Sequence, residues 1–372
     1  MRRVLTIVAL AGFLCAVARA ESDIEKRVAA IKKDVIDKMT AAAPEKATVQ
    51  PAKPHKILIY TLPMGFPHSS IPFAAKSLEI MGKKTGAYEV TITDDASTLD
   101  PENLKQYDAI VQDQCTGDCF QPKEHVAIRR EIDAINNKIN DCNNKLKDKK
   151  KPPTDDETAA LKKKIEELKP QLADPQQRLA ALPPAKAQEE KWKQAVLDFV
   201  KGGKAIIGVH AATDCYYGWR DYGEMMGGYF SGHPYNKHVA KLDDPTHPIM
   251  AAFEGKPFDY ADEMYVFGPK GKSKDGKDNQ TYSRDNQRVL MSIDAAASKI
   301  DIKAGGRADG DYAISWIRNY GQGRVFYCSY GHNESTWWQP KILRHYLDGI
   351  QWALGDLKAD ATPVPLKAEE QK

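Results

Sequence analysis

The chain has 372 residues, of which 42% are hydrophobic and 28% charged, a composition typical of a globular protein with one large core or two modest ones. Lys and Arg number 54 against 51 Asp and Glu, but three of the arginines fall in a predicted signal peptide, so the mature chain has a net charge near zero. Because the mature chain has no excess of basic residues, its charge does not favour nucleic acid as a partner.

Met1–Ala20 is predicted to be a secretory signal peptide. Arg2 and Arg3 precede an apolar stretch over 4–17, and Ala18-Arg19-Ala20 fits an A-x-A cleavage site. An uncleaved membrane anchor is the alternative, but the apolar stretch is short for a bilayer span, and no later stretch is apolar enough. We therefore expect an exported protein, periplasmic or secreted, with no membrane span once the signal is removed.

Five cysteines follow the signal peptide: Cys115, Cys119, Cys142, Cys215 and Cys328. Their number is odd, so at least one thiol is free or pairs between chains. Export permits a disulfide. We expect one among Cys115, Cys119 and Cys215, most simply Cys115–Cys119, because the segments after the third and fourth strands should be neighbours. Cys142 and Cys328 are expected to pack in apolar surroundings.

The first element of the mature chain is predicted to be an amphipathic helix over Ser22–Ala43. Its apolar side chains recur at helical spacing, at Ile24, Val28, Ile31, Val35 and Met39. A linker rich in Pro, Ala and Lys follows over Pro44–Pro54. We expect this helix to pack on the domain as an appendage rather than to carry function.

Strands and helices alternate from Lys56 onward. Strands are expected at 56–60, 88–93, 108–112 and 205–209, with helices at 73–84, 99–104 and 186–201 between them. This alternation predicts βαβ units and a parallel sheet. Further strands are expected at 238–242, 258–267, 287–293, 313–317 and 324–329, followed by a helix over 337–354 and a charged tail from 356.

A polar stretch over 123–188 interrupts the third crossover. Aliphatic residues recur at heptad-like spacing on both sides of a Lys-rich turn at 147–156 that contains two adjacent prolines. Two such seams predict an antiparallel coiled-coil hairpin inserted in the domain, and a disordered charged linker is the alternative. A hairpin of this kind could contact a protein partner or a second copy of the chain.

Histidines follow several of the expected strands. His68 follows the first strand, His210 ends the apolar run 205–209, and His332 follows the strand over 324–329, while His233 lies in a Gly-rich segment. Open α/β sheets bind their ligands at the carboxyl ends of the strands. We therefore expect these four imidazoles to meet at one rim.

Six segments of the chain resemble the ThuA-like (trehalose-utilisation) family. They are GVHAATD (208–214), GGYFSGHP (227–234), HPI (247–249), DEMY (262–265), SWIRNYGQGRVFYCSYGH (315–332) and IQWALG (350–355). The resemblance covers Lys56–Gly355 apart from the hairpin. It implies the α/β, flavodoxin-like fold of the class I glutamine amidotransferases, a mostly parallel sheet with helices on both faces, and a link to sugar metabolism.

The turn after the strand at 205–209 departs from the glutamine amidotransferases. Their nucleophile is a cysteine in a G-x-C-x-G turn, whereas here the turn reads Gly208-Val209-His210-Ala211-Ala212. Because His210 stands where the cysteine would be, this turn supplies no thiolate for acyl transfer. Cysteine-dependent glutamine hydrolysis is therefore disfavoured.

Imidazole is both a common metal ligand and a proton carrier near neutral pH. The candidate metal ligands are His68, His210, His233 and His332, and a carboxylate from Asp262 or Glu263 would complete a site for Zn²⁺, Mn²⁺ or Fe²⁺. No pair has the spacing of an HExxH helix. Metal-free acid–base use of the same residues, and purely structural histidines, therefore stay open as alternatives.

Other residues are candidates by chemistry. Glu263 and Tyr265 could act beside a sugar, since a carboxylate and a phenol suit enolisation, and a structural strand-end carboxylate is the alternative for Glu263. The candidate catalytic residues are therefore His210, Glu263, Tyr265 and His332. The candidate substrate-binding residues are His68, Asp214, Trp337 and Trp338, the two indoles as platforms for a pyranose. His247 is expected to hold a turn, and His55, His125 and His345 to lie on the surface without a role.

Two functions from different classes follow. The first is an exported enzyme that acts on a sugar or keto-sugar at a His-rich site, metal-bound or acid–base. The second is a non-catalytic carbohydrate-binding or scaffold protein that uses the helical hairpin for partner contacts. Loss of the hairpin would leave the first activity intact and would abolish the second.

Overall fold

The computed structural model describes residues 22–268, 281–301, 306–307 and 309–366, and the predicted signal peptide lies outside them. The described strands form one nine-stranded sheet in the order β2-β1-β3-β4-β9-β8-β7-β5-β6. Their bounds are β1 Lys56–Tyr60, β2 Glu89–Thr93, β3 Ala109–Asp113, β4 Ala205–Val209, β5 Phe230–Leu242, β6 Phe258–Phe267, β7 Arg288–Ile293, β8 Ala313–Tyr320 and β9 Gly323–Cys328.

The sheet has a parallel part and an antiparallel part. Strands β2, β1, β3, β4 and β9 pair in parallel. Strands β8, β7, β5 and β6 extend the sheet beyond β9 with antiparallel pairings. The α/β fold predicted from the sequence, with a mostly parallel sheet, is confirmed.

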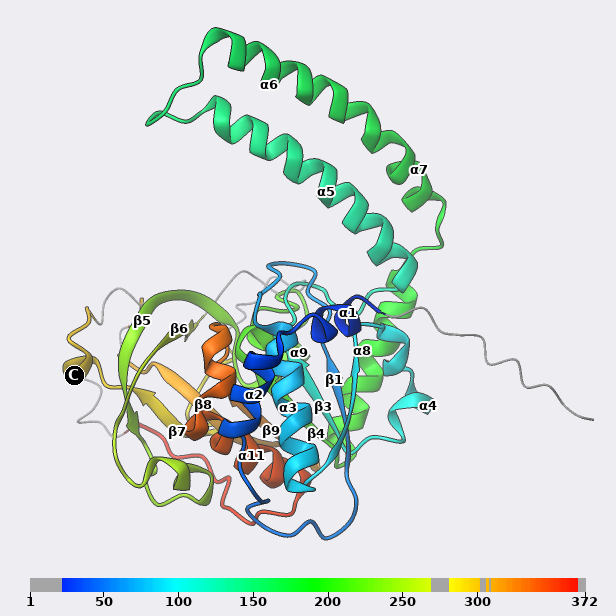
Figure 1. Cartoon of the computed structure of the whole chain (residues 1–372). Coiled ribbons are helices and arrows are strands. Elements are labelled where there is room, and N and C mark those ends of the chain that lie inside the picture. The colour runs from blue at the N-terminus through cyan, green and yellow to red at the C-terminus, as the bar shows by residue number, and fades with distance from the viewer. Residues whose placement is uncertain (1–21, 269–280, 302–305, 308, 367–372) are drawn as a thin grey trace, which may run out of the picture.

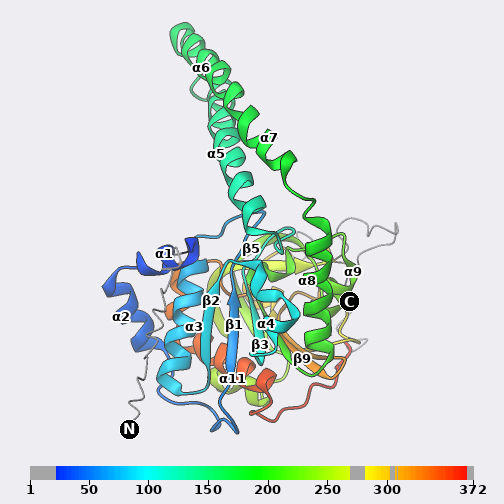
Figure 2. The same ribbon diagram turned by 90° about the vertical axis from the view of Figure 1, so that its right-hand side faces the viewer.

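Helices cover both faces of this sheet (Figures 1 and 2). One face carries α3 (Ile71–Thr85) and α11 (Pro340–Leu354), and the other carries α8 (Lys186–Lys201) and α9 (Arg220–Met226). Alternation along β1 supplies both cores, because Ile57 and Ile59 belong to one cluster and Leu58 and Tyr60 to the other. Burial on both faces explains the continuous apolar runs of the central strands.

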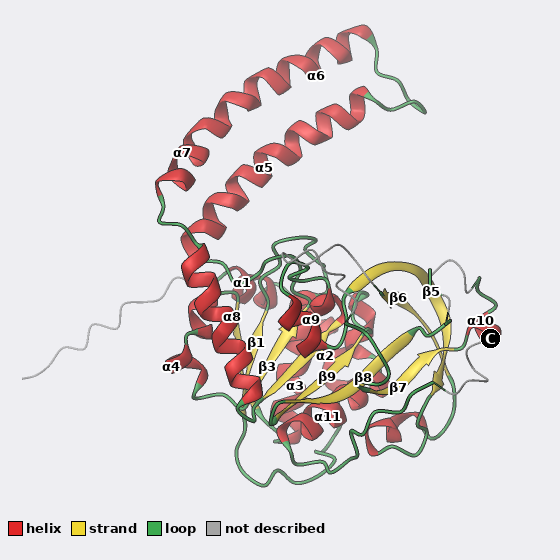
Figure 3. Ribbon diagram, turned by 180° about the vertical axis from the view of Figure 1, so that it is seen from behind, coloured by secondary structure: helices red, strands yellow, loops and turns green. Residues whose placement is uncertain are grey.

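The remaining elements complete the described chain. The α-helices are α1 (Asp23–Ala29), α2 (Lys33–Ala42), α4 (Pro101–Leu104), α5 (Lys123–Leu146), α6 (Asp155–Leu168), α7 (Ala173–Ala181) and α10 (Ala295–Ser298). The 3₁₀ turns are η1 (Ala96–Leu99), η2 (Lys169–Leu172), η3 (His210–Thr213), η4 (Pro248–Phe253) and η6 (Glu334–Trp338). Figure 3 shows that the loops joining the strands gather at the two ends of the sheet.

The N-terminal segment differs from the single helix that was expected. It forms two helices, α1 and α2, which both pack against α3. The chain leaves helical geometry at Lys32, which has extended backbone angles. Ile24, Ile31 and Met39 are each buried in this arrangement. The expectation that this segment packs on the domain is met.

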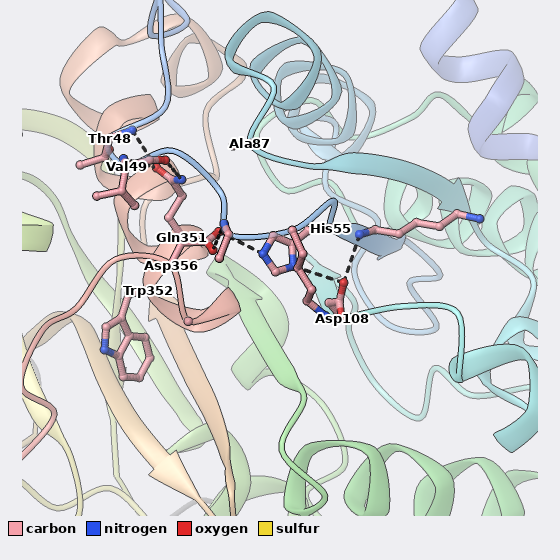
Figure 4. Close-up of polar contacts among 12 residues, drawn as sticks. Thr48, Val49, His55, Ala87, Asp108, Gln351, Trp352 and Asp356 are labelled. Atoms are coloured by element: carbon pink, nitrogen blue, oxygen red, sulfur yellow. Dashed lines mark hydrogen bonds and ion pairs between the residues drawn. The ribbon is translucent and has the colours of Figure 1, made fainter.

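The linker after α2 is fastened at the amino-terminal edge of the parallel strands (Figure 4). Gln351 of α11 accepts a hydrogen bond from the Thr48 main chain and donates one to the Val49 carbonyl, both at 2.7 Å. His55 lies between two carboxylates, with Nδ1 3.2 Å from Asp108 and Nε2 3.0 Å from Asp356. His55 is buried by these contacts, contrary to the surface position that was expected.

Two further histidines predicted to be exposed are also buried. His345 is fully buried in α11, where Nδ1 contacts the Ile249 carbonyl and Nε2 contacts the Ser315 hydroxyl, both at 3.1 Å. His125 is buried at the start of α5. The polar character of histidine suggested exposure, but these contacts satisfy the ring of His345 inside the core. His247 does hold a turn, since Nδ1 accepts from the Ile249 main chain.

Helices α5, α6 and α7 project from the domain (Figures 1 and 2). Helix α5 packs along both α6 and α7, and Cys142, Ile165 and Leu168 are buried between them. A capping box at Thr154 and Glu157 starts α6 just after the two prolines. Among the described residues, no helix combines the length and apolarity needed to cross a membrane.

The five described cysteines are all buried and free. Cys119 contacts both Cys115 and Cys215, so the expected proximity of these three residues is present. The disulfide expected among them is not formed. Instead, the Cys115 thiol donates to the Tyr60 carbonyl at 3.3 Å and the Cys215 thiol donates to the Cys115 carbonyl at 2.9 Å.

Candidate functional site

His210 occupies a strained turn at the carboxyl end of β4. Its φ is +43°, a left-handed conformation that side chains other than Gly rarely adopt and that clusters at functional sites. The ring is fully buried, with Nδ1 2.7 Å from the Ser329 carbonyl oxygen. Because a carbonyl can only accept, Nδ1 carries the proton and the lone pair of the neutral ring is on Nε2.

Four side chains converge at this turn. His68 comes from the loop between β1 and α3, His210 from η3, Glu263 from β6, and His332 from the loop after β9. One ligand atom from each lies within 4.8 Å of the others. Ring centroids of His68 lie 5.0 Å from His210 and 5.2 Å from His332. The expected meeting of His68, His210 and His332 at the carboxyl ends of the strands is therefore present.

Three of the imidazole nitrogens in this cluster are buried without a hydrogen-bond partner: His68 Nδ1, His210 Nε2 and His332 Nδ1. Glu263 Oε2 lies 3.5 Å from His210 Nε2 and 3.2 Å from His332 Nδ1, within ion-pair distance. Buried polar atoms normally form hydrogen bonds, and each buried polar atom that forms none makes the free energy of folding less favourable. The cluster therefore presents donor atoms that the protein itself does not fully use.

Glu263 is charged at neutral pH. Burial alone would raise the pKa of its carboxyl, but the ion-pair contacts of Oε2 with His210 and His332 outweigh burial and hold the pKa well below the usual range. The contact with the Glu263 carboxylate in turn raises the pKa of His332. Glu263 is thus the negative group around which the imidazoles gather.

His68 is neutral at neutral pH. Burial, followed by the proximity of His210 and His332, lowers its pKa to about 3. Its loop is anchored from outside, because Arg27 of α1 donates a hydrogen bond to the His68 carbonyl oxygen at 3.3 Å. A neutral imidazole with a free nitrogen is the form that binds metals.

His233, expected as a fourth imidazole ligand, lies outside the group of four. Its Nδ1 is 3.1 Å from Oε1 of Glu263, the oxygen turned away from His210 and His332, and its side chain is 54% exposed. The reason is local: β5 begins at Phe230, earlier than expected, and its backbone is irregular near Gly232. Glu263 takes the fourth position instead.

Tyr265 lies beside His210, with ring centroids 4.2 Å apart. Burial, and then the neighbouring phenol and carboxylate groups, raise the pKa of its hydroxyl well above the usual value. The phenol is therefore protonated at neutral pH and can serve as a hydrogen-bond donor but not as a base. Its placement next to His210 agrees with the candidate group named from the sequence.

The two expected sugar platforms do not face the cluster. Trp337 is fully buried, donates to the Gly331 carbonyl at 3.2 Å and packs on Tyr346. Trp338 packs on Phe73 of α3 and lies under Lys38 of α2. Both indoles therefore belong to the core and to the packing of the N-terminal helices.

Two acidic residues near the cluster have internal partners. Asp262 accepts hydrogen bonds from the main chains of Gly331 and Asn333 at 2.7 and 2.9 Å and from the Thr336 hydroxyl at 2.9 Å, so it anchors the His332 loop. Asp214, expected to bind substrate, accepts a hydrogen bond from the hydroxyl of Tyr217. Neither residue contributes an atom to the group of four.

Sequence reasoning did not single out Ser329. Its carbonyl fixes the tautomer of His210 and its hydroxyl accepts from the Tyr265 main chain at 3.2 Å. The only signal available was its position at the end of a strand, three residues before His332. Main-chain partners of this kind carry no side-chain signature in a sequence.

The donor set has two chemical uses. Imidazole nitrogens with a carboxylate oxygen are ligands that Zn²⁺, Mn²⁺ and Fe²⁺ take in proteins. The same groups can also transfer protons to and from a bound substrate.

Comparison with known proteins places this geometry in a family context. The family model ThuA, described as trehalose utilisation, matches residues 56–135 and 177–353. The unmatched stretch 136–176 falls within α5, α6, η2 and α7. No curated protein matches the chain.

Solved structures of ThuA-like proteins are also similar to the chain. One from Bacteroides uniformis ATCC 8492 has 15% identity and a TM-score of 0.49, covering 82% of this chain and 94% of that one. One from Parabacteroides merdae ATCC 43184 has 13% identity and a TM-score of 0.43, covering 83% of this chain and 93% of that one.

Proposed function

We propose that this chain, which belongs to the ThuA (trehalose utilisation) family, is an exported enzyme that acts on a sugar or keto-sugar at the cluster of His68, His210, Glu263 and His332. We further propose that the four side chains hold a divalent cation, Zn²⁺, Mn²⁺ or Fe²⁺. The observation that carries the proposal is the convergence of three imidazoles and one charged carboxylate, whose ligand atoms all lie within 4.8 Å of one another.

The residues fit such a cation. Removing three imidazole nitrogens from water without a partner has a cost that a bound cation would offset. The carboxylate of Glu263 supplies the negative charge, and the hydrogen bond from His210 Nδ1 to the Ser329 carbonyl is the kind of outer contact that orients a histidine ligand. A divalent cation at this position would polarise a carbonyl or hydroxyl oxygen of the sugar.

The chain's own groups would handle substrate and protons. Oε1 of Glu263 faces His233, which is more than half exposed, so these two residues connect the buried cluster with solvent. The phenol of Tyr265, which is protonated and packs beside His210, would serve as a hydrogen-bond donor rather than as a base. Burial of His68 and His210 keeps water from one side of the cluster.

Elemental analysis of the purified mature protein tests the proposal, followed by titration of the metal-free protein with Zn²⁺ and Mn²⁺. We expect about one equivalent of metal in the wild type and loss of that metal in His210→Ala. His247→Asn is the control, because His247 holds a turn and contributes no atom to the group of four. If His210→Ala binds metal and sugar as the wild type does, the proposal is wrong.

A second candidate function is a non-catalytic carbohydrate-binding or scaffold protein. It is favoured by α5, α6 and α7, which project from the domain and include the stretch that the family model does not match. Deleting 123–185 and rejoining the ends separates the two functions. The enzyme predicts intact metal and sugar binding in the deletion variant, and the scaffold predicts loss of a partner or of self-association.

A further inference from the structure

Phe66 is the most exposed large hydrophobic side chain in the described part of the chain. It is 62% exposed, ahead of Val364 at 48%. Single exposed hydrophobic residues are common on protein surfaces and need no explanation by themselves. The position of Phe66 is what makes it informative, since it lies two residues before His68, in the loop between β1 and α3.

Hydrogen bonds with Thr116 hold the main chain of the loop at Phe66. Thr116, which is buried, donates its hydroxyl to the Phe66 carbonyl at 3.0 Å and accepts from the Gly65 main chain at 3.1 Å. The Thr116 carbonyl also accepts from the Met64 main chain at 2.8 Å. A Cβ on Gly65 would lie 3.1 Å from the Thr116 hydroxyl, so glycine allows this close approach.

Pro67 further restricts the backbone between Phe66 and His68. Thr116 binds the main-chain carbonyl of Phe66, and the ring of Phe66 packs edge-to-face on the buried ring of His68. These contacts restrict the backbone that carries the exposed ring. An aromatic ring fixed in water loses little further freedom when a ligand packs on it.

The ring of Phe66 borders the cluster directly. Its centroid lies 4.8 Å from that of His68, with the rings at 75° to each other. His68 in turn contacts His210 and His332. A single imidazole therefore separates the exposed face of Phe66 from the centre of the four side chains. The side chain of His332, which is 32% exposed, also reaches solvent.

We infer that Phe66 is the platform on which the sugar packs, so that the ligand class of this site is a pyranose. The inference rests on the proposed function, because it assumes that a sugar binds at the cluster. A pyranose has an apolar face of C–H groups that packs on an aromatic ring, while its hydroxyls remain free to face polar groups. Phe66 takes the role that the sequence assigned to Trp337 and Trp338.

The test compares Phe66→Ala and Phe66→Trp with Val364→Ala, a second exposed hydrophobic residue that lies in the C-terminal tail. Binding of trehalose, glucose and the open-chain polyol sorbitol is measured by isothermal titration and by saturation-transfer NMR. Metal content and thermal unfolding of each variant are measured alongside.

We expect Phe66→Ala to weaken trehalose and glucose binding by about tenfold, in line with the loss of one aromatic contact. Phe66→Trp should retain binding, and Val364→Ala should match the wild type. Sorbitol should bind more weakly than glucose to the wild type. Metal content and thermal unfolding should be unchanged in all three variants.

Three outcomes overturn the inference: wild-type affinity for both pyranoses in Phe66→Ala, equal binding of sorbitol and glucose, or no pyranose binding by the wild type. The failure of the proposed metal site looks different. If the wild type contains no metal but Phe66→Ala still weakens trehalose binding, the metal centre is contradicted and the platform is supported. If the wild type contains metal and Phe66→Ala binds trehalose with unchanged affinity, only the platform is contradicted.

Discussion

Arg27 donates a hydrogen bond to the main-chain carbonyl of His68 across 3.3 Å, and so joins the N-terminal helix α1 to the loop that supplies an imidazole of the cluster. Residue 27 precedes the region matched by the family model, which begins at 56. The N-terminal segment, expected only to pack on the domain, therefore also supports the candidate site.

Replacing Arg27 by Gln removes this support. Because outer partners of metal ligands affect affinity by about 10–100-fold and Arg27 acts only through a main-chain carbonyl, we expect Zn²⁺ affinity to fall by about three- to tenfold. Competition with a chromophoric chelator measures the change. Lys26→Gln is the matched control, since Lys26 is exposed on the same helix. An Arg27→Gln variant with wild-type affinity would show that the contact does not position His68.

Glu263→Gln keeps the shape of the side chain and removes its charge. We expect Zn²⁺ affinity to fall by more than about 100-fold, because an amide is a much poorer ligand than a carboxylate. In the metal-free protein, the pKa of His332 should decrease, since the hydrogen bond to Glu263 is what raises it. NMR titration of the histidine ring protons checks this directly. An unchanged pKa for His332 would contradict the ion pair.

Stability should fall in mild acid through His345. Burial lowers its pKa from 6.5 to about 4, so the unfolded chain takes up a proton between these pH values while the folded chain does not. Stability is therefore greatest above pH 6.5 and decreases as the pH falls toward 4, by about 3 kcal/mol for this residue. Urea unfolding at pH 7 and pH 4.5 measures the loss.

His345→Gln provides the comparison for that measurement. Its amide can still contact the Ile249 carbonyl or the Ser315 hydroxyl, but it does not titrate. The variant should be less stable than the wild type at pH 7 and should lose less stability between pH 7 and pH 4.5. Equal losses in both proteins would assign the acid sensitivity to other groups.

The cysteines give a prediction about covalent structure. All five described cysteines are free, so alkylation of the unfolded, unreduced protein should add five groups by mass spectrometry. A protein isolated from the export compartment with only three modified cysteines would instead support the disulfide expected from the sequence. Peptide mapping would then show which two of Cys115, Cys119 and Cys215 are paired.

The parallel part of the fold was predictable because its signals are local. Apolar runs bounded by glycine or polar residues mark β1, β3 and β4, and the end of the run at Val209 places His210 at the carboxyl end of a strand. The positions of His68 and His332 followed from the same rule. These predictions needed only the order of the elements along the chain.

The rest of the site depends on distant contacts that no local pattern encodes. Trp337 and Trp338 are adjacent, yet one packs in the main core and the other under α2, which the sequence places three hundred residues away. His233 lies outside the group of four because β5 begins earlier than expected and its pairing with β6 is bulged, whereas Glu263 takes a ligand position already open to it in the sequence. Phe66 was overlooked because exposure is a property of the folded surface.

Glu263 belongs to β6, the outermost strand of the antiparallel part, whereas the imidazoles come from loops at the parallel strands. The bulged β5–β6 pair curls over so that this edge carboxylate reaches His210, as its curved ribbon in Figure 1 suggests. The three histidines thus lie on one part of the sheet and their negative counterpart on the other. A change that displaced β6 from β5 would leave the three imidazoles in place and remove the carboxylate from among them.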